Sequence, residues 1–117
     1  MSHDIQKRED VVRLVDNFYA AVLDDTLLAP FFLHIDFEHH KPRMVHFWSF
    51  VLLDEPGYVT NIFDKHAHMD LTKAALERWV SLFEFTTRQL FSGENTEQAV
   101  LRAKTIAWTF QEKMKLG

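Results

Sequence analysis

The sequence predicts an all-α fold with four main helices. Apolar residues recur at the i, i+3, i+4, i+7 spacing of amphipathic helices in four separate segments. The composition is that of an ordinary globular protein, with 47% hydrophobic and 26% charged residues, three glycines and three prolines. A length of 117 residues suits one domain with one core, so we expect a single domain over residues 1–117.

The first helix is expected over residues 8–24. Its end is predicted by the Ala29-Pro30 pair, because the residue before a proline is displaced from the helical region. Phe31 and Phe32 should then form a tight corner. The apolar positions expected to face inward are Val11, Val12, Leu14, Val15, Phe18, Tyr19, Val22 and Leu23.

The second helical segment is expected over residues 37–53. Proline is tolerated in the first turn of a helix, so Pro42 predicts that the regular helix begins near Lys41 and that His40 lies at its edge. Weak backbone hydrogen bonding there would let the His40 ring act as a mobile gate. The inward positions expected of this segment are His40, Met44, Phe47, Trp48 and Val51 or Leu52.

A long loop is expected over residues 54–70, with one short helical turn over residues 63–67. Loops of this length inside a compact domain are often functional. The third helix is expected over residues 72–91 and ends at Ser92-Gly93. Asn95-x-x-Gln98 resembles a capping box that starts the fourth helix. The apolar positions of these two helices are Leu76, Trp79, Val80, Phe83, Leu90 and Phe91, then Ala99, Ala103, Ile106, Ala107, Phe110 and Met114.

Charge and composition exclude several classes of partner. The net charge of −4 and the lack of a basic stripe argue against a nucleic-acid partner. No apolar run approaches the roughly 20 residues of a membrane span, so we expect no membrane partner, and the first residues lack the apolar stretch of a signal peptide. The absence of cysteine excludes disulfides and thiolate metal sites and fits a cytoplasmic location. A monomer or weak dimer is expected.

The seven histidines permit three kinds of metal chemistry. Zinc through His39-His40 or His66-x-His68 is disfavoured, because structural zinc sites generally use thiolates and no His-Glu-x-x-His pair is present. A di-iron bundle needs Glu-x-x-His pairs, which do not occur. Haem needs an imidazole and a large apolar slot.

The residues offer haem both of these. His66 is the candidate axial ligand, and Phe63 lies on the same side of a short turn. His40, Met44, Phe47 and Trp48 share one helical face and would form a wall. Tyr19 and Trp79 face inward from the first and third helices. The same rings would also fill an ordinary core, so a haem-free helical sensor or interaction domain stays open.

A set of ordered motifs resembles the group III truncated haemoglobins of bacteria. The motifs span about residues 9–112 and are Asn17-Phe-Tyr-Ala-Ala-Val22, Pro30-Phe-Phe32, His40-x-x-x-Met44-x-x-Phe-Trp48, Leu52-Leu53, Asn61-x-x-x-x-His66, Arg78-Trp-x-x-Leu-Phe83 and Arg102-Ala-x-x-Ile-Ala107. The resemblance implies a shortened globin fold, a helical sandwich around non-covalent haem b. It implies ligation of the iron by His66, for which His68 is the alternative.

The resemblance also implies a polar distal side that binds O2, NO or CO. Its residues would be Tyr19, Trp79 and, at the mouth, His40. Phe32, with Phe31 as its rival, would pack on the haem, and Met44 would lie over the ligand. Two donors would stabilise bound oxygen and slow its release. Slow release suits removal of nitric oxide or peroxide with a separate electron-donor reductase better than oxygen transport, and ligand binding is favoured over a dedicated enzymatic role.

Overall fold

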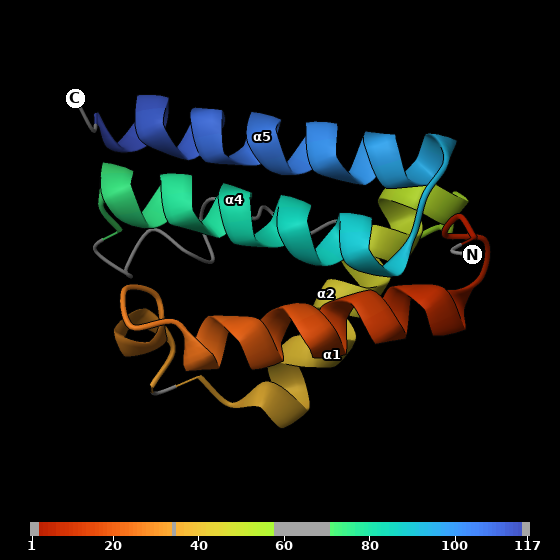
Figure 1. Cartoon of the computed structure of the whole chain (residues 1–117), viewed down its shortest axis with the longest axis horizontal. Helices are drawn as coiled ribbons and strands as arrows, with labels where there is room; N and C mark the ends of the chain where they lie inside the picture. Colours follow the sequence, from red (N-terminus) through yellow and green to blue (C-terminus); the bar gives the residue numbers. More distant parts are fainter. Residues whose placement is uncertain (1–2, 34, 58–70, 116–117) are drawn as a thin grey trace.

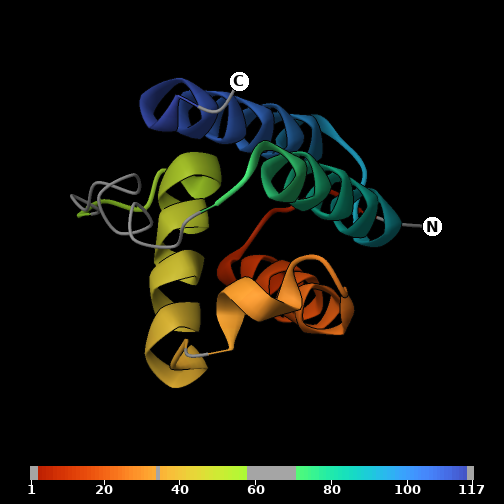
Figure 2. The same ribbon diagram turned by 90° about the vertical axis from the view of Figure 1, so that its left-hand side faces the viewer.

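The computed structural model describes residues 3–33, 35–57 and 71–115, and this part of the chain is helical. Its elements are α1 (Arg8–Asp24), the 3-10 turn η1 (Ala29–Phe32), α2 (Phe37–Leu53), α4 (Lys73–Leu90) and α5 (Glu94–Met114). Helices α1, α4 and α5 run side by side, with α4 antiparallel to both neighbours (Figure 1). Helix α2 lies across them and contacts α1 and α5 (Figure 2). Within these ranges, none of the helices has the length and apolar character to cross a membrane.

Helix α1 has the predicted bounds and presents one buried stripe to the core. Its buried apolar residues are Val11, Leu14, Val15, Phe18, Tyr19 and Val22. The prediction that Val12 and Leu23 also face inward is wrong, because both side chains are exposed. Each lies one residue beyond a member of the stripe, and one residue turns the side chain by about 100° around the helix axis.

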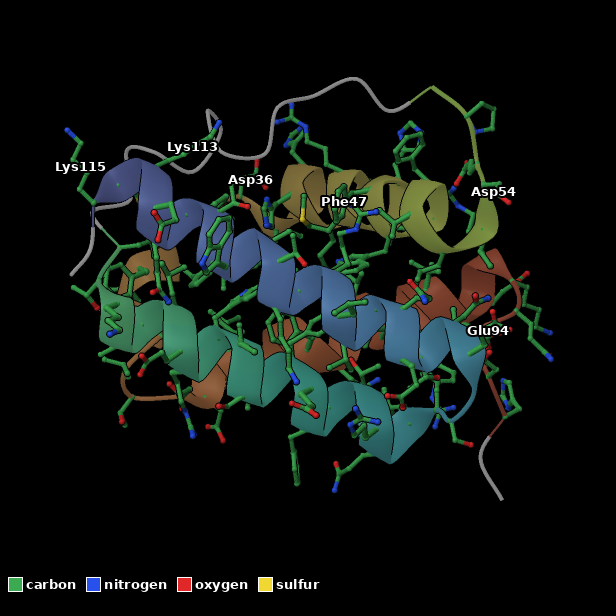
Figure 3. The ribbon with its side chains drawn as sticks, turned by 90° about the horizontal axis from the view of Figure 1, so that it is seen from above. Asp36, Phe47, Asp54, Glu94, Lys113 and Lys115 are labelled. Carbon is green, nitrogen blue, oxygen red and sulfur yellow. The ribbon has the colours of Figure 1, made fainter. Side chains whose placement is uncertain are left out.

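Helix α2 also has the predicted bounds, but its regular part begins earlier than expected. The Asp36 side chain caps it by accepting a hydrogen bond from the Glu38 N–H at 3.1 Å, and the His40 N–H donates to the Asp36 carbonyl at 2.9 Å. The prediction of a start near Lys41 is therefore wrong. Pro42 leaves the Glu38 carbonyl without its usual donor, and because both residues are exposed, water can take that place. Figure 3 shows Asp36 and Asp54 at the two ends of this helix.

Helix α4 agrees with the prediction to within one residue at each end. The Thr72 hydroxyl accepts a hydrogen bond from the Ala75 N–H at 3.0 Å and caps the first turn. Phe91 follows the last helical residue with extended backbone and is buried. Because α4 packs against α1 on one side and α5 on the other, its residues bridge the two halves of the core.

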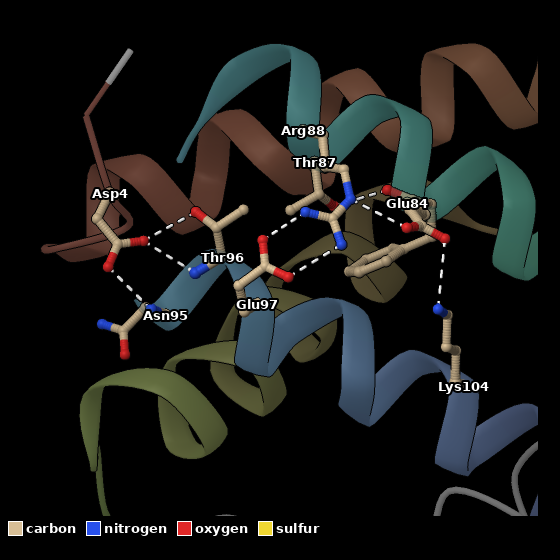
Figure 4. Close-up of polar contacts among 9 residues, drawn as sticks. Asp4, Glu84, Thr87, Arg88, Asn95, Thr96, Glu97 and Lys104 are labelled. Carbon is tan, nitrogen blue, oxygen red and sulfur yellow. Dashed lines mark hydrogen bonds and ion pairs between the residues drawn. The ribbon is translucent and has the colours of Figure 1, made fainter. Parts of the chain in front are cut away.

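Helix α5 is capped by a residue that lies far away in the sequence. The Asp4 carboxylate accepts hydrogen bonds from the Asn95 N–H at 2.8 Å, the Thr96 N–H at 2.9 Å and the Thr96 hydroxyl at 2.8 Å (Figure 4). The predicted Asn95 capping box is therefore wrong: the Asn95 side chain instead donates to the Ile5 carbonyl at 2.7 Å. Gly93 makes room for this contact, since a Cβ there would lie 2.5 Å from the Asp4 Cγ.

Residues 3–7, which we name the N-terminal strap, thus tie the start of the chain to the α4–α5 corner. Ile5 is fully buried, and the His3 carbonyl accepts a hydrogen bond from the Ser92 N–H at 3.1 Å. Asp10 fixes the other end of the strap by accepting from the Gln6 N–H at 3.0 Å. The strap and the C-terminal end of α5 lie at opposite ends of the molecule (Figure 1).

Candidate functional site

An apolar pocket lies where the end of α1, η1, the middle of α2, the start of α4 and the second half of α5 converge. The space between its walls, together with the part open to solvent, is about 710 Å³. Its lining residues are Phe18, Tyr19, Leu28, Phe32, Met44, Phe47, Trp48, Leu71, Ala75, Leu76, Trp79, Ile106, Ala107 and Phe110.

This pocket is lined by most of the residues that the sequence predicts to form a site. From α1, the corner, α2 and α4 these are Tyr19, Phe32, Met44, Phe47, Trp48 and Trp79. The structure also separates the two corner phenylalanines, since Phe32 is buried and lines the pocket whereas Phe31 is only partly buried beside the core. Phe63, His66 and His68 lie outside the described residues, as does the predicted short turn over residues 63–67.

The wall opposite α2 was not predicted as part of a site. Ile106 and Phe110 on α5 were expected only to face a core, and Leu28 and Leu71 belonged to no predicted pattern. Their apolar character was the only available signal, and it does not distinguish a pocket wall from ordinary packing.

A stack of aromatic rings connects α4 to α2 at the inner side of the pocket. The ring of Phe83 stacks on Trp48 with centroids 4.8 Å apart and on Trp79 with centroids 5.7 Å apart. Phe18 meets Trp79 edge to face at 5.8 Å. Offset and edge-to-face pairs at such distances are favourable. The orientation of Trp79, which is partly buried, is therefore held from two sides.

Tyr19 lines the pocket and is bonded to His40, which was predicted as part of the wall but is not among the lining residues. The Tyr19 hydroxyl is hydrogen bonded to the His40 Nε2 at 2.9 Å, and the two rings meet edge to face at 5.2 Å. Phe37 and Phe32 pack around Tyr19 with centroids 5.4 and 6.0 Å away. Burial raises the pKa of the Tyr19 hydroxyl well above its usual range, because the charged phenolate loses its hydration. Tyr19 therefore stays a neutral phenol that donates and accepts.

The prediction that weak backbone hydrogen bonding before Pro42 leaves His40 mobile is wrong. Its backbone belongs to regular helix, and its ring is bonded to a buried tyrosine. In this arrangement the imidazole lies against the Tyr19 ring and hydroxyl.

Trp79 supplies a second donor at the pocket. Its indole N–H has no hydrogen-bond partner among the residues that the structure describes, and an indole nitrogen only donates. Its neighbour Arg78 fixes the start of α4 to the corner, because its guanidinium pairs with the Asp25 carboxylate at 2.7 Å. Asp25 also accepts from the Leu28 N–H at 3.0 Å. Burial opposes ionisation of Asp25, but the hydrogen bonds from Arg78 and Leu28 outweigh it and lower its pKa.

The adjacent histidines His39 and His40 do not converge on a shared metal site. His39 Nδ1 is paired with the exposed Asp36 Oδ2 at 2.7 Å, whereas His40 is bonded to Tyr19. In the described ranges, no three His, Cys, Asp or Glu side chains lie close enough together to hold a metal ion.

Comparisons with known proteins agree with this geometry. No protein-family model matches the chain. A group 3 truncated hemoglobin, ctb, from Campylobacter jejuni is 26% identical, in an alignment that covers 97% of this chain and 95% of that protein. The crystal structure of the group III truncated hemoglobin from Campylobacter jejuni superposes with a TM-score of 0.87 at 27% identity, covering 97% of this chain and 94% of that one.

These likenesses confirm two predictions made from the motifs. The ordered motifs extend over nearly the whole chain, and the similarity in sequence and in fold covers the same extent. The chain is therefore similar over nearly its whole length to a group III truncated haemoglobin and has the truncated-globin fold.

Proposed function

We propose that the pocket holds a haem and that the protein binds O2, NO or CO at the haem iron. The observation that carries this proposal is the pocket itself: among the described residues its walls are aromatic and aliphatic, and their polar groups are the Tyr19 hydroxyl, which is bonded to His40, and the Trp79 indole. A porphyrin ring needs apolar walls, and a diatomic ligand needs a few donors at one place. The relationship to truncated haemoglobins supports the same cofactor.

His66 is the proposed axial ligand. Four of the seven histidines lie in the described ranges and are engaged elsewhere: His3 with Asp10, His39 with Asp36, His46 with the Pro56 carbonyl and His40 with Tyr19. The Asn61-x-x-x-x-His66 motif matches the resemblance, and His68 remains the rival. Because the chain has no cysteine, the haem is proposed to be a non-covalent haem b.

A haem bound here would supply an iron that could be held by the His66 imidazole and could bind a diatomic ligand. Phe32, Met44, Phe47 and Trp48 would exclude water from the ring. The Trp79 indole and the Tyr19 hydroxyl would donate hydrogen bonds to a polar ligand. Each such bond contributes on the order of 1 kcal/mol, and about 2–3 kcal/mol when the acceptor carries charge.

These donors favour retention of the ligand over rapid release. Two bonds of this size would slow oxygen loss by tens to thousands of times. We therefore infer that the protein serves chemistry on the bound ligand, such as nitric oxide or peroxide removal, more readily than oxygen transport. That chemistry requires a separate electron donor.

Titration of the haem-free protein with haem tests the proposal. We expect one haem to bind per chain and to produce an intense Soret band. Met44→Glu would place a carboxylate in the pocket wall and should weaken binding at least tenfold, because a buried charge is costly. The matched control Leu33→Glu changes an exposed leucine outside the pocket lining and should bind haem like wild type. A colourless protein after haem addition would instead support a haem-free helical domain.

A further inference from the structure

The pocket has a close neighbour on the outer side of the α4–α5 pair. This neighbour, which we name the outer hollow, lies between the two helices, which run side by side (Figure 1). Leu76 on α4 and Ala107 on α5 line both the pocket and the outer hollow, and each is only 4% exposed. A single layer of side chains therefore separates the two spaces here. We name Leu76 and Ala107 the partition.

The partition is apolar and is held by few groups. Leu76, Ala107 and Phe110 form a small core cluster, against which the partly buried Trp79 and Val80 pack. Ala107 contributes a methyl group, which has no alternative rotamer. The leucine side chain does have alternative rotamers. Any opening of the partition therefore depends on movement of the Leu76 side chain.

The inner side of the partition lies next to the Trp79 donor. Leu76 and Trp79 are three residues apart on α4, so they share a helical face, and both line the pocket. Ile106, which precedes Ala107 on α5, lines the pocket as well. A molecule that crosses the partition thus enters on the side of the pocket that carries the indole.

The outer hollow has a rim of mixed charge. Glu77 on α4 and Lys104 on α5 both line it, and Lys104 also lies 3.6 Å from the Glu84 carboxylate. A rim with both signs attracts neither anions nor cations strongly. An ion would also have to lose its water in order to pass Leu76 and Ala107, which is costly. A neutral apolar molecule does not meet that cost.

We propose that the partition is an entry route by which neutral diatomic molecules pass between α4 and α5 into the pocket. Its residues lie on α4 and α5, whereas His40 lies on α2, so the route does not require the Tyr19–His40 bond to break. Passage through the partition is a property of the protein without haem. The role of the route in delivering O2, NO or CO to iron rests on the proposed function.

Quenching of tryptophan fluorescence by dissolved dioxygen tests the route in the full chain without haem. The chain has three tryptophans, and Trp108→Phe removes the exposed one, so the remaining fluorescence comes from Trp48 and Trp79, which line the pocket. In this background, Leu76→Ala should raise the dioxygen quenching constant about twofold or more, because it leaves a cavity in the partition. The quenching constant of iodide should not change, because the apolar path excludes an ion.

Two further variants make the test specific. Leu52→Ala is the matched control: Leu52 is buried but lines neither the pocket nor the outer hollow, so the dioxygen constant should stay at its background value. Val80→Phe narrows the outer hollow without changing the pocket lining and should lower the dioxygen constant about twofold. Circular dichroism checks the folding of each variant, and Val80→Phe tests the route by itself where Leu76→Ala does not fold.

Three results would each overturn the proposal. These are an equal rise of the dioxygen constant in Leu76→Ala and Leu52→Ala, a rise for iodide as large as that for dioxygen, and an unchanged dioxygen constant in Val80→Phe. A protein that binds no haem would overturn the proposed function instead, and the quenching constants test the route in either case.

Discussion

The two ends of the α4–α5 pair are built in different ways. At the strap end, Ile5 and Phe91 are buried completely, and the Asp4 carboxylate accepts three hydrogen bonds from the start of α5. At the pocket end, the partly buried Met44 and Trp79 border a pocket with few polar contacts. The contacts that stabilise the fold are therefore concentrated away from the site, where they leave room for a ligand. Substitutions at the two ends should therefore affect different measurements.

The largest effect on stability is expected from Asp4→Ala. It removes the acceptors of two backbone N–H groups and one hydroxyl at the start of α5. We expect unfolding in urea to show a loss of about 2–3 kcal/mol and the midpoint of thermal unfolding to fall by roughly 10 °C. Haem affinity should stay close to wild type.

Asp24→Ala is the control for this prediction. Asp24 is an exposed carboxylate at the end of α1, so its removal should change the unfolding free energy by less than about 0.5 kcal/mol. Equal losses in the two variants would show that the strap does not stabilise the fold.

The strap should also make stability sensitive to acid. Burial opposes ionisation of Asp4 and Asp10, but hydrogen bonds from Asn95 and Thr96, and from Gln6 and His3, lower both pKa values below the ordinary 3.8. Carboxyl groups with a lowered folded pKa stabilise the fold above the unfolded pKa. That contribution is lost as pH falls through the folded pKa. Asp4→Asn should therefore have a flatter stability curve than wild type below about pH 5. Parallel curves would contradict this role of Asp4.

At the pocket end, Tyr19→Phe should change ligand release and leave stability nearly unaltered. The ring and its contacts with Phe37 and Phe32 stay, and only the hydroxyl is lost. Stopped-flow oxygen dissociation is expected to change several-fold, while the unfolding free energy changes by about 1 kcal/mol or less. An unchanged rate would show that Tyr19 does not contact the ligand.

The smallest effect is expected from His40→Ala, which should speed ligand association more than it alters oxygen release. The His40 ring is bonded to the hydroxyl of Tyr19, which lines the pocket, so its removal should free the Tyr19 side of the pocket. Trp79→Phe should do the reverse, since it removes the indole donor and leaves a smaller aromatic ring in its place. Flash photolysis of the carbon monoxide complex measures association. Equal rates in His40→Ala and wild type would exclude a gate at this position.

The same contrast explains how much of the structure could be predicted from the sequence. The bounds of α1 and α4 depend on local apolar spacing and on a nearby cap such as Thr72, so they were predicted closely. The cap of α5 comes from Asp4, which is 91 residues from Asn95, and no local pattern contains it. Pro42 led to the prediction of a later start of α2, because proline has no N–H to donate to the Glu38 carbonyl. The sequence does not show that this carbonyl is exposed and can accept from water instead.

In the candidate site too, the residues that depend on local spacing were predicted and those that depend on tertiary packing were not. Met44, Phe47 and Trp48 form one wall through helical spacing alone, and that wall was predicted. The Tyr19–His40 hydrogen bond joins two helices, and the opposite wall with Ile106 and Phe110 depends on how α5 packs. Such contacts follow from tertiary arrangement, which periodicity does not determine.

Haem titration of two variants tests most directly the proposal that the pocket holds a haem through His66. His66→Ala and His68→Ala are folded separately without haem, checked by circular dichroism and titrated while the Soret band is recorded. We predict that His66→Ala loses most of its haem affinity and that His68→Ala binds haem like wild type. Loss of affinity in His68→Ala with retention in His66→Ala would contradict the account.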